Sequence, residues 1–163
     1  MRPVTVKDDF PPGFHEALGR LAVAFARVEY LTKLAVKSLS GKGFTAGMEH
    51  AESQRQFGNL CREAKKLATY RLPEPQAATF CGLIDEALKL AIERNDNLHA
   101  LWTTDDAGRP ERYRPFFNRE TKALDWRSRP VTIEELHRHE GAMNWLFNTL
   151  VQTTKAWPSI PPL

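Results

Sequence analysis

Apolar residues recur at helical spacing over four long stretches of the chain. They cover residues 14–39, 53–70, 75–98 and 133–156. Within each stretch the apolar side chains fall three or four positions apart, which places them on one face of a helix. The pattern therefore predicts four amphipathic helices with short connections, which is typical of an all-α, mostly up-and-down four-helix bundle.

Signals at the helix ends support these boundaries. The sequence Ser-Gly-Lys-Gly at 40–43 ends the first helix, and a loop that contains Gly47 leads to the second. Pro75 is well placed in the first turn of the third helix. Thr132 followed by Glu135 is a capping-box sequence, which predicts the start of the last helix.

The segment between the third and fourth helices has a different pattern. Turn-forming residues at 103–108 precede two short stretches, 112–114 and 124–127, that are typical of extended structure. Pro110 and Pro115 restrict such strands to the edge of a sheet. We expect a small basic β-hairpin or meander here, an insertion at residues 103–131 of a single helical domain at 13–157, with a lead-in at 1–12 and a tail at 158–163.

Composition and charge fit a folded domain with one basic segment. The 163 residues are 42% apolar and 26% charged, with a net charge of only +3. Residues 109–130 hold seven Arg and Lys residues against three acidic ones, so this segment alone carries +4. The rest of the chain is therefore close to neutral.

The beginning of the chain and its apolar runs predict a cytoplasmic protein without a membrane segment. The N-terminal residues include acidic side chains and no apolar core, unlike a secretory signal. The longest apolar runs are about six residues, against the ~20 needed to span a bilayer. Cys61 and Cys81 have no metal-ligand spacing and are interpreted as two reduced thiols on apolar helix faces.

A polar run interrupts the apolar face of the third helix near its end. That face passes through Phe80, Ile84, Ala87 and Ala91. The next positions on it carry Arg94 and Asn95, and His99 follows four residues beyond Asn95 on the same side. Because burying an unpaired arginine is costly, the run requires a partner acid such as Asp96, a subunit interface or a wet active-site cleft. We favour an interface and a cleft together.

The run Arg94-Asn95-Asp96-Asn97-Leu98-His99 resembles the R-x4-H motif of the HEPN superfamily, a group of small all-α domains. The likeness includes the polar residue directly after the arginine and the place of the motif at the end of the third long helix. The order of helices extends the resemblance over about residues 14–157, but only the six-residue run is specific. The basic hairpin is an addition to the minimal core of that family.

The resemblance implies a metal-independent endoribonuclease without a cofactor, which acts as a homodimer and brings Arg and His of both subunits to one cleft. His99 would exchange protons with the ribose 2′-hydroxyl or the departing 5′-oxygen, a role that suits histidine because it titrates near neutral pH. Arg94 would hold the phosphate and stabilise the charge of the transition state, and Asn95 would orient either group. The products would be a 2′,3′-cyclic phosphate and a 5′-hydroxyl.

Helix geometry gives a separate reason to expect a dimer. Five residues separate Arg94 from His99, about 140° around an unbroken helix. One subunit therefore presents the two side chains poorly together, unless the helix ends or bends near Asn97. A two-fold interface that repeats both residues solves the same problem.

Four further residues are candidates for substrate binding. Trp102 would either stack on an RNA base or anchor the core or an interface. Arg109, Arg112 and Arg114 would either follow an RNA backbone or form a solvated basic strand face. His137 and His139 lie roughly 200° apart around a helix, so they cannot share a metal ion and are interpreted as surface residues. No metal site is predicted.

Three functions follow from these patterns. The first is an RNA-cleaving homodimer with Arg94, Asn95 and His99 as catalytic residues, in a toxin or defence role that could include a cognate antitoxin. The second is a non-catalytic helical module of the same fold that binds RNA, a nucleotide or a protein partner. The third is a plain four-helix interaction protein whose basic hairpin docks on an acidic partner.

Overall fold

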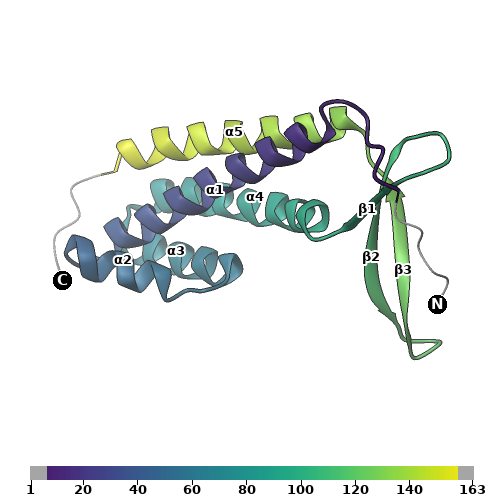
Figure 1. Cartoon of the computed structure of the whole chain (residues 1–163). Coiled ribbons are helices and arrows are strands. Elements are labelled where there is room, and N and C mark those ends of the chain that lie inside the picture. The colour runs from purple at the N-terminus through teal and green to yellow at the C-terminus, as the bar shows by residue number, and fades with distance from the viewer. Residues whose placement is uncertain (1–6, 158–163) are drawn as a thin grey trace.

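The computed structural model describes residues 7–157 (Figure 1). The helices are α1 (Phe14–Leu39), α2 (Phe44–Glu52), α3 (Phe57–Arg71), α4 (Glu74–Leu98) and α5 (Ile133–Lys155). The strands β1 (Leu101–Thr104), β2 (Pro110–Asn118) and β3 (Ala123–Pro130) lie between α4 and α5. The expected tail at 158–163 and the first six residues of the expected lead-in lie outside the described part.

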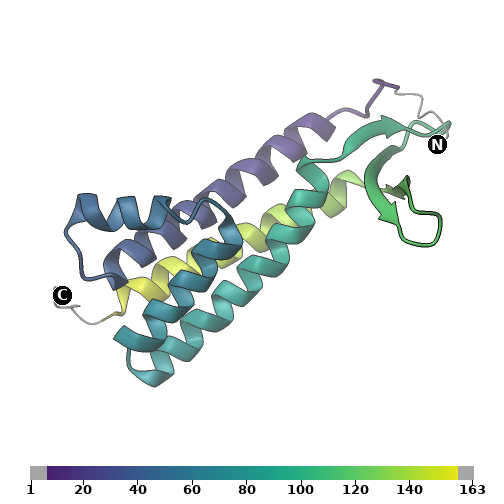
Figure 2. The same ribbon diagram turned by 90° about the horizontal axis from the view of Figure 1, so that it is seen from below.

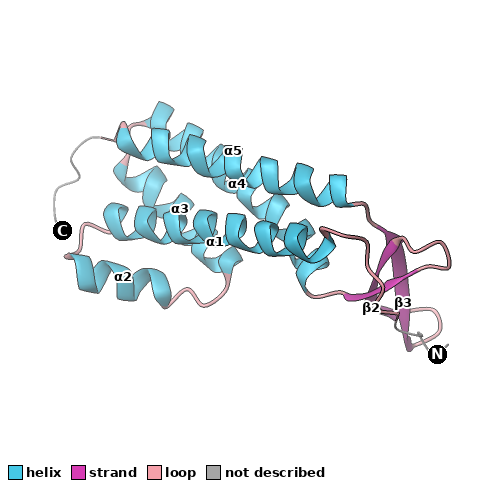
Figure 3. Cartoon of the chain, turned by 45° about the horizontal axis from the view of Figure 1, so that its top comes forward, coloured by secondary structure: helices cyan, strands magenta, loops and turns pink. Residues whose placement is uncertain are grey.

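The sheet occupies one end of an elongated helical bundle, as two perpendicular views show (Figures 1 and 2). Colouring by secondary structure separates the helices from the strands (Figure 3). Helices α1 and α5 begin beside the sheet, and α4 ends there. Over residues 7–157 no helix combines the length and apolar character needed to cross a membrane.

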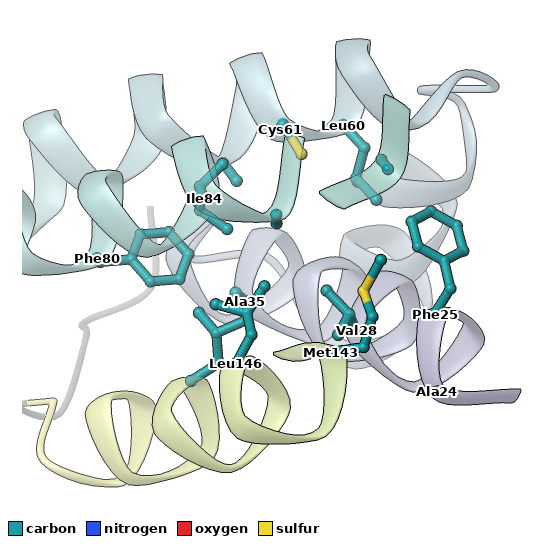
Figure 4. Packing of buried hydrophobic residues seen from close by; sticks show 14 of the residues in the cluster. Ala24, Phe25, Val28, Ala35, Leu60, Cys61, Phe80, Ile84, Met143 and Leu146 are labelled. Atoms are coloured by element: carbon teal, nitrogen blue, oxygen red, sulfur yellow. The ribbon is translucent and has the colours of Figure 1, made fainter. Parts of the chain in front are cut away.

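The core fills the space between α1, α3, α4 and α5 (Figure 4). The predicted apolar face of α4 is confirmed, because its four apolar residues before Arg94 are all buried. Side chains from α1 and α5, such as Val28, Met143 and Leu146, meet this face with no measurable exposure. Burial of apolar surface at roughly 25 cal/mol per Å² is the main force that holds the helices together.

The predicted four-helix bundle with a small hairpin is wrong, because the described residues form five helices and a three-stranded antiparallel sheet. The additional helix α2 lies where the sequence predicted a loop around Gly47. A glycine inside a helix destabilises it by about 1 kcal/mol relative to alanine. The helical signal in the sequence around Gly47 is therefore weak. A Cβ at Gly47 would lie 2.9 Å from Lys37 Cγ and 3.2 Å from the Lys37 carbonyl oxygen. The glycine therefore permits α2 to pack closely against the end of α1.

The sheet is also larger than predicted, because it includes β1 and extends β2 and β3 in both directions. Its order is β1-β2-β3, so β2 is central although it contains Pro110 and Pro115. Pro110 is the first residue of the strand, and β1 pairs with β2 only as far as Tyr113. At Pro115 the strand therefore has a neighbour on the β3 side alone, which is the edge environment that proline requires.

His139 is buried at 5% exposure between α5 and α4, so its interpretation as a surface residue is wrong. Its Nε2 lies 3.0 Å from the Leu90 carbonyl oxygen, and Nδ1 is buried without a hydrogen-bond partner. Burial lowers the pKa of His139, and the positive charge of Arg112 acts in the same direction, while Glu93 and the Leu90 carbonyl oppose it. The folded protein therefore favours the neutral imidazole.

Replacing Ile84 by alanine should lower the free energy of unfolding by about 2–5 kcal/mol, since it leaves a cavity at a fully buried site. Ile92→Ala is the matched control, because Ile92 lies on the same helix at 67% exposure. Urea unfolding of both variants measures the difference. Equal losses would contradict the described core.

Acidification should destabilise the protein through His139. The unfolded chain takes up a proton near the ordinary histidine pKa of ~6.5, whereas the folded protein resists it, so stability falls as the pH drops below that value. The slope from this group reaches at most about 1.4 kcal/mol per pH unit. His139→Gln should flatten the pH profile of urea unfolding between pH ~5 and ~7, and His137→Gln on the exposed side of α5 should not.

Candidate functional site

The candidate catalytic residues lie at the C-terminal end of α4. The helix ends at Leu98, and His99 is the capping residue, with its N–H donated to the Asn95 carbonyl oxygen at 3.0 Å. Asn95 and His99 are exposed, Arg94 is half-buried, and Asn97 is buried. The helix thus ends close to Asn97, the position of a helix end or bend that the sequence leaves open as an alternative to a two-fold interface. The polar run divides into inward-facing and outward-facing side chains.

Arg94 continues the apolar face of α4 with the flat surface of its guanidinium. The group stacks on the Phe25 ring, with 4.0 Å between Cζ and the ring centroid. Its Nη1 donates to Asn95 Oδ1 at 2.6 Å, and its Nε is buried without a hydrogen-bond partner. Burial lowers the pKa of Arg94, although an arginine remains charged at neutral pH. Stacking on an aromatic ring offsets part of the cost of this burial.

Asp96 contacts the sheet arginines and forms no ion pair with Arg94. Its two carboxylate oxygens lie 3.8 Å from Arg112 Nη2 and 3.6 Å from Arg114 Nη2. Both arginines project from β2 toward the last turn of α4. There they also face the negative end of the helix dipole.

Asn97 joins α4 to the sheet with its side chain and its backbone. Its Oδ1 accepts a hydrogen bond of 2.5 Å from Arg112 Nη1, and its carbonyl oxygen accepts one of 2.8 Å from Trp102 Nε1. Asn97 is 3% exposed and Arg112 is 9% exposed. Burial lowers the pKa of Arg112, and Asp96 opposes this shift. These contacts favour a positioning role for Arg112 at the helix–sheet junction.

Among the described residues, Trp102 contacts the motif run only through the Asn97 carbonyl, and Arg109 forms no hydrogen bond or ion pair with that run. The indole of Trp102 is half-buried and meets the edge of Phe14 at a centroid distance of 4.9 Å, which favours the core-anchor alternative over base stacking. Arg109 lies in the turn between β1 and β2, where its guanidinium pairs with Asp105 at 2.7 Å. Neither side chain lines the hollow beside the end of α4.

Arg114 brings the basic sheet next to the HEPN-like run. Its Nη1 donates to the Asn95 carbonyl oxygen at 3.0 Å, which is the same oxygen that accepts the His99 N–H. Because Asn95 Oδ1 also accepts from Arg94, this one residue contacts an arginine on each side. The candidate site therefore combines Arg94, Asn95, His99 and Arg114 around the last turn of α4.

The register of the sheet adds two arginines that the sequence analysis did not select. Arg112 lies directly opposite Arg129, and Arg114 lies directly opposite Arg127. Because alternate residues of a strand share a face, all four project from the same side of the sheet. They line an open hollow of about 480 Å³ together with Asp96, Pro115, Phe116 and Ser128. The repeated Arg-x-Arg spacing at 112–114 and 127–129 is the signal that could have identified this arginine hollow.

The described residues offer no cluster of metal ligands. Within residues 7–157, no three His, Cys, Asp or Glu side chains are grouped as ligands for a metal ion. Cys61 is buried, and burial raises the pKa of its thiol to about 12, so the thiolate nucleophile is scarce at neutral pH.

Comparisons of the chain with protein-family models, with curated proteins and with solved structures find no match. The resemblance to the HEPN superfamily therefore remains an expectation that depends on the six-residue run.

Replacing Asn97 by alanine should reduce the free energy of unfolding by about 1–3 kcal/mol, since it leaves the buried Arg112 without its acceptor. Asn148→Ala on the exposed face of α5 is the matched control and should be near neutral. Chemical unfolding measures both. A neutral Asn97 variant would show that the junction contributes little to stability.

Proposed function

We propose that this chain is a cytoplasmic, metal-independent endoribonuclease that acts as a homodimer. The observation that carries the proposal is the contact between the two candidate regions, since one backbone oxygen of Asn95 accepts from both His99 and Arg114. The backbone of His99, an exposed residue, and the Arg114 guanidinium, which can hold a phosphate, thus meet at one oxygen. An imidazole and a guanidinium are the two groups that metal-free cleavage of RNA needs.

In the proposed reaction His99 takes the proton of the ribose 2′-hydroxyl or gives one to the departing 5′-oxygen. The 2′-oxygen forms a bond to phosphorus, and the bond from phosphorus to the 5′-oxygen breaks. The products are a 2′,3′-cyclic phosphate and a 5′-hydroxyl. Because charge accumulates on the phosphate oxygens in the transition state, a nearby guanidinium lowers the barrier.

The dimer is part of the proposal because Arg94 is engaged in contacts within its own copy. Arg94 is held between Phe25 and Asn95, whereas His99 projects from the helix end as an exposed residue. A two-fold arrangement would supply a second His99 and a second Arg94 to a shared cleft. The size of the protein in solution tests this element separately from activity.

The His99→Ala variant should lose RNA cleavage by about 10²–10⁴-fold, since that is the usual contribution of a general acid or base. The measurement is the cleavage rate of mixed cellular RNA in EDTA by purified full-length protein, with analysis of the product ends. His137→Ala is the control, because His137 is an exposed histidine on α5.

Cyclic phosphate ends that disappear in His99→Ala and persist in His137→Ala would support the nuclease. A folded wild-type protein that cuts no RNA would overturn it and leave the non-catalytic binding module. Equal loss in both histidine variants would also contradict a specific role for His99. The contacts of Arg94 with Phe25 and Asn95 would then be explained as part of the structural core.

A further inference from the structure

The arginine hollow carries an excess of positive charge, which favours binding of an anion. Four guanidiniums line it together with a single carboxylate, that of Asp96. We propose that the hollow binds a backbone phosphate of single-stranded RNA, next to the cleavage site. In this form the inference rests on the proposed nuclease function, and it deepens that function by assigning a phosphate subsite.

Two like-charged pairs face each other across the strands, and this arrangement is unfavourable without a counter-ion. Side chains directly opposite in an antiparallel pair have Cβ atoms about 4.5–5.5 Å apart, and like charges there destabilise the sheet. Asp96 reaches the two arginines of β2, and Glu135 pairs with Arg129 at 3.1 Å. Glu93 also acts on Arg112 through its charge, so three carboxylates oppose four guanidiniums. A bound phosphate would compensate the remaining charge.

Arg127 is the arginine best prepared for a ligand. Within residues 7–157 its side chain has no acidic partner and no hydrogen bond, and its guanidinium lies over the Phe116 ring at 5.1 Å from the centroid. The ring holds the planar group while its N–H donors stay free, since stacking uses only the face of the guanidinium. Arg114, directly opposite, is half-buried and can contribute its remaining donors to the same phosphate.

The dimensions of the hollow also suit a phosphate with an adjoining sugar. Its volume of about 480 Å³ is within the usual range for small-ligand sites. The Arg114 guanidinium reaches from the hollow to the backbone oxygen that accepts the His99 N–H. A strand of RNA that enters the hollow would therefore pass beside His99, and the phosphate held there would neighbour the one that is cleaved.

The test measures binding of a labelled single-stranded oligouridine in EDTA, with His99→Ala as the background so that cleavage does not consume the probe. Adding Arg127→Gln should weaken binding on the order of tenfold. It should also reduce the salt dependence, by about 0.7 in the slope of log K against log salt. Arg62→Gln on α3 is the control, since it removes the same charge from an exposed position outside the hollow. Thermal unfolding checks that the variants fold equally well.

The outcomes test the phosphate subsite separately from the nuclease activity. Weaker binding in Arg127→Gln alone supports the subsite, even if the wild-type protein cleaves no RNA and the proposed function fails. Equal affinities in both arginine variants overturn the subsite, even if cleavage depends on His99. Inorganic pyrophosphate is the second probe. Binding of pyrophosphate that depends on Arg127, without any binding of RNA, would overturn the RNA assignment in favour of a free phosphate compound.

Discussion

The architecture depends on how the C-terminal end of α4 satisfies its backbone carbonyl groups. A helix leaves its last carbonyls without partners inside the helix. At α4 the sheet donates to the Asn97 carbonyl and adds a second hydrogen bond to the Asn95 carbonyl, which also accepts the His99 N–H. Arg114 donates to the Asn95 carbonyl and Trp102 to the Asn97 carbonyl, while Arg112 fills the acceptor of the Asn97 side chain. These bonds fix the orientation of the sheet. They therefore also determine where the arginine hollow opens.

The same junction gives the polar run two functions at once. Its inward side chains, Arg94 and Asn97, extend the buried face of α4 with polar groups. Arg94 lies over the Phe25 ring, and Asn97 accepts a hydrogen bond from Arg112. Its outward residues, Asn95 and His99, are exposed. The interruption of the apolar face thus has a structural cause, and the proposed chemistry would add a second one. The two causes apply to different residues of one run.

Helix periodicity made much of the fold predictable, because each long helix buries a face of regular spacing. Helix α1 has the expected bounds, and the capping box of Thr132 and Glu135 starts α5 as predicted. Helix α2 was missed because close packing at Gly47 outweighs a weak local preference. Arg127 and Arg129 were not chosen as candidate binding residues. Their position opposite Arg114 and Arg112 depends on the register of β2 and β3, which the sequence pattern does not specify. His99 and Arg114 could be named from sequence, but not their shared contact with Asn95.

The short pairing of β1 with β2 divides the sheet into two mechanical parts. Three strands are paired only as far as Tyr113, and from Arg114 to the turn the chain continues as a two-stranded ribbon. A two-stranded ribbon is only marginally stable by itself, so its outer part can bend or fray at little cost. Arg114 and Arg127 lie directly opposite each other at the start of this ribbon, one residue beyond Tyr113, the last residue of β2 that pairs with β1. An anion held between these two arginines would link β2 to β3 at this point. Binding in the hollow would therefore reduce the motion of the two-stranded ribbon beyond it.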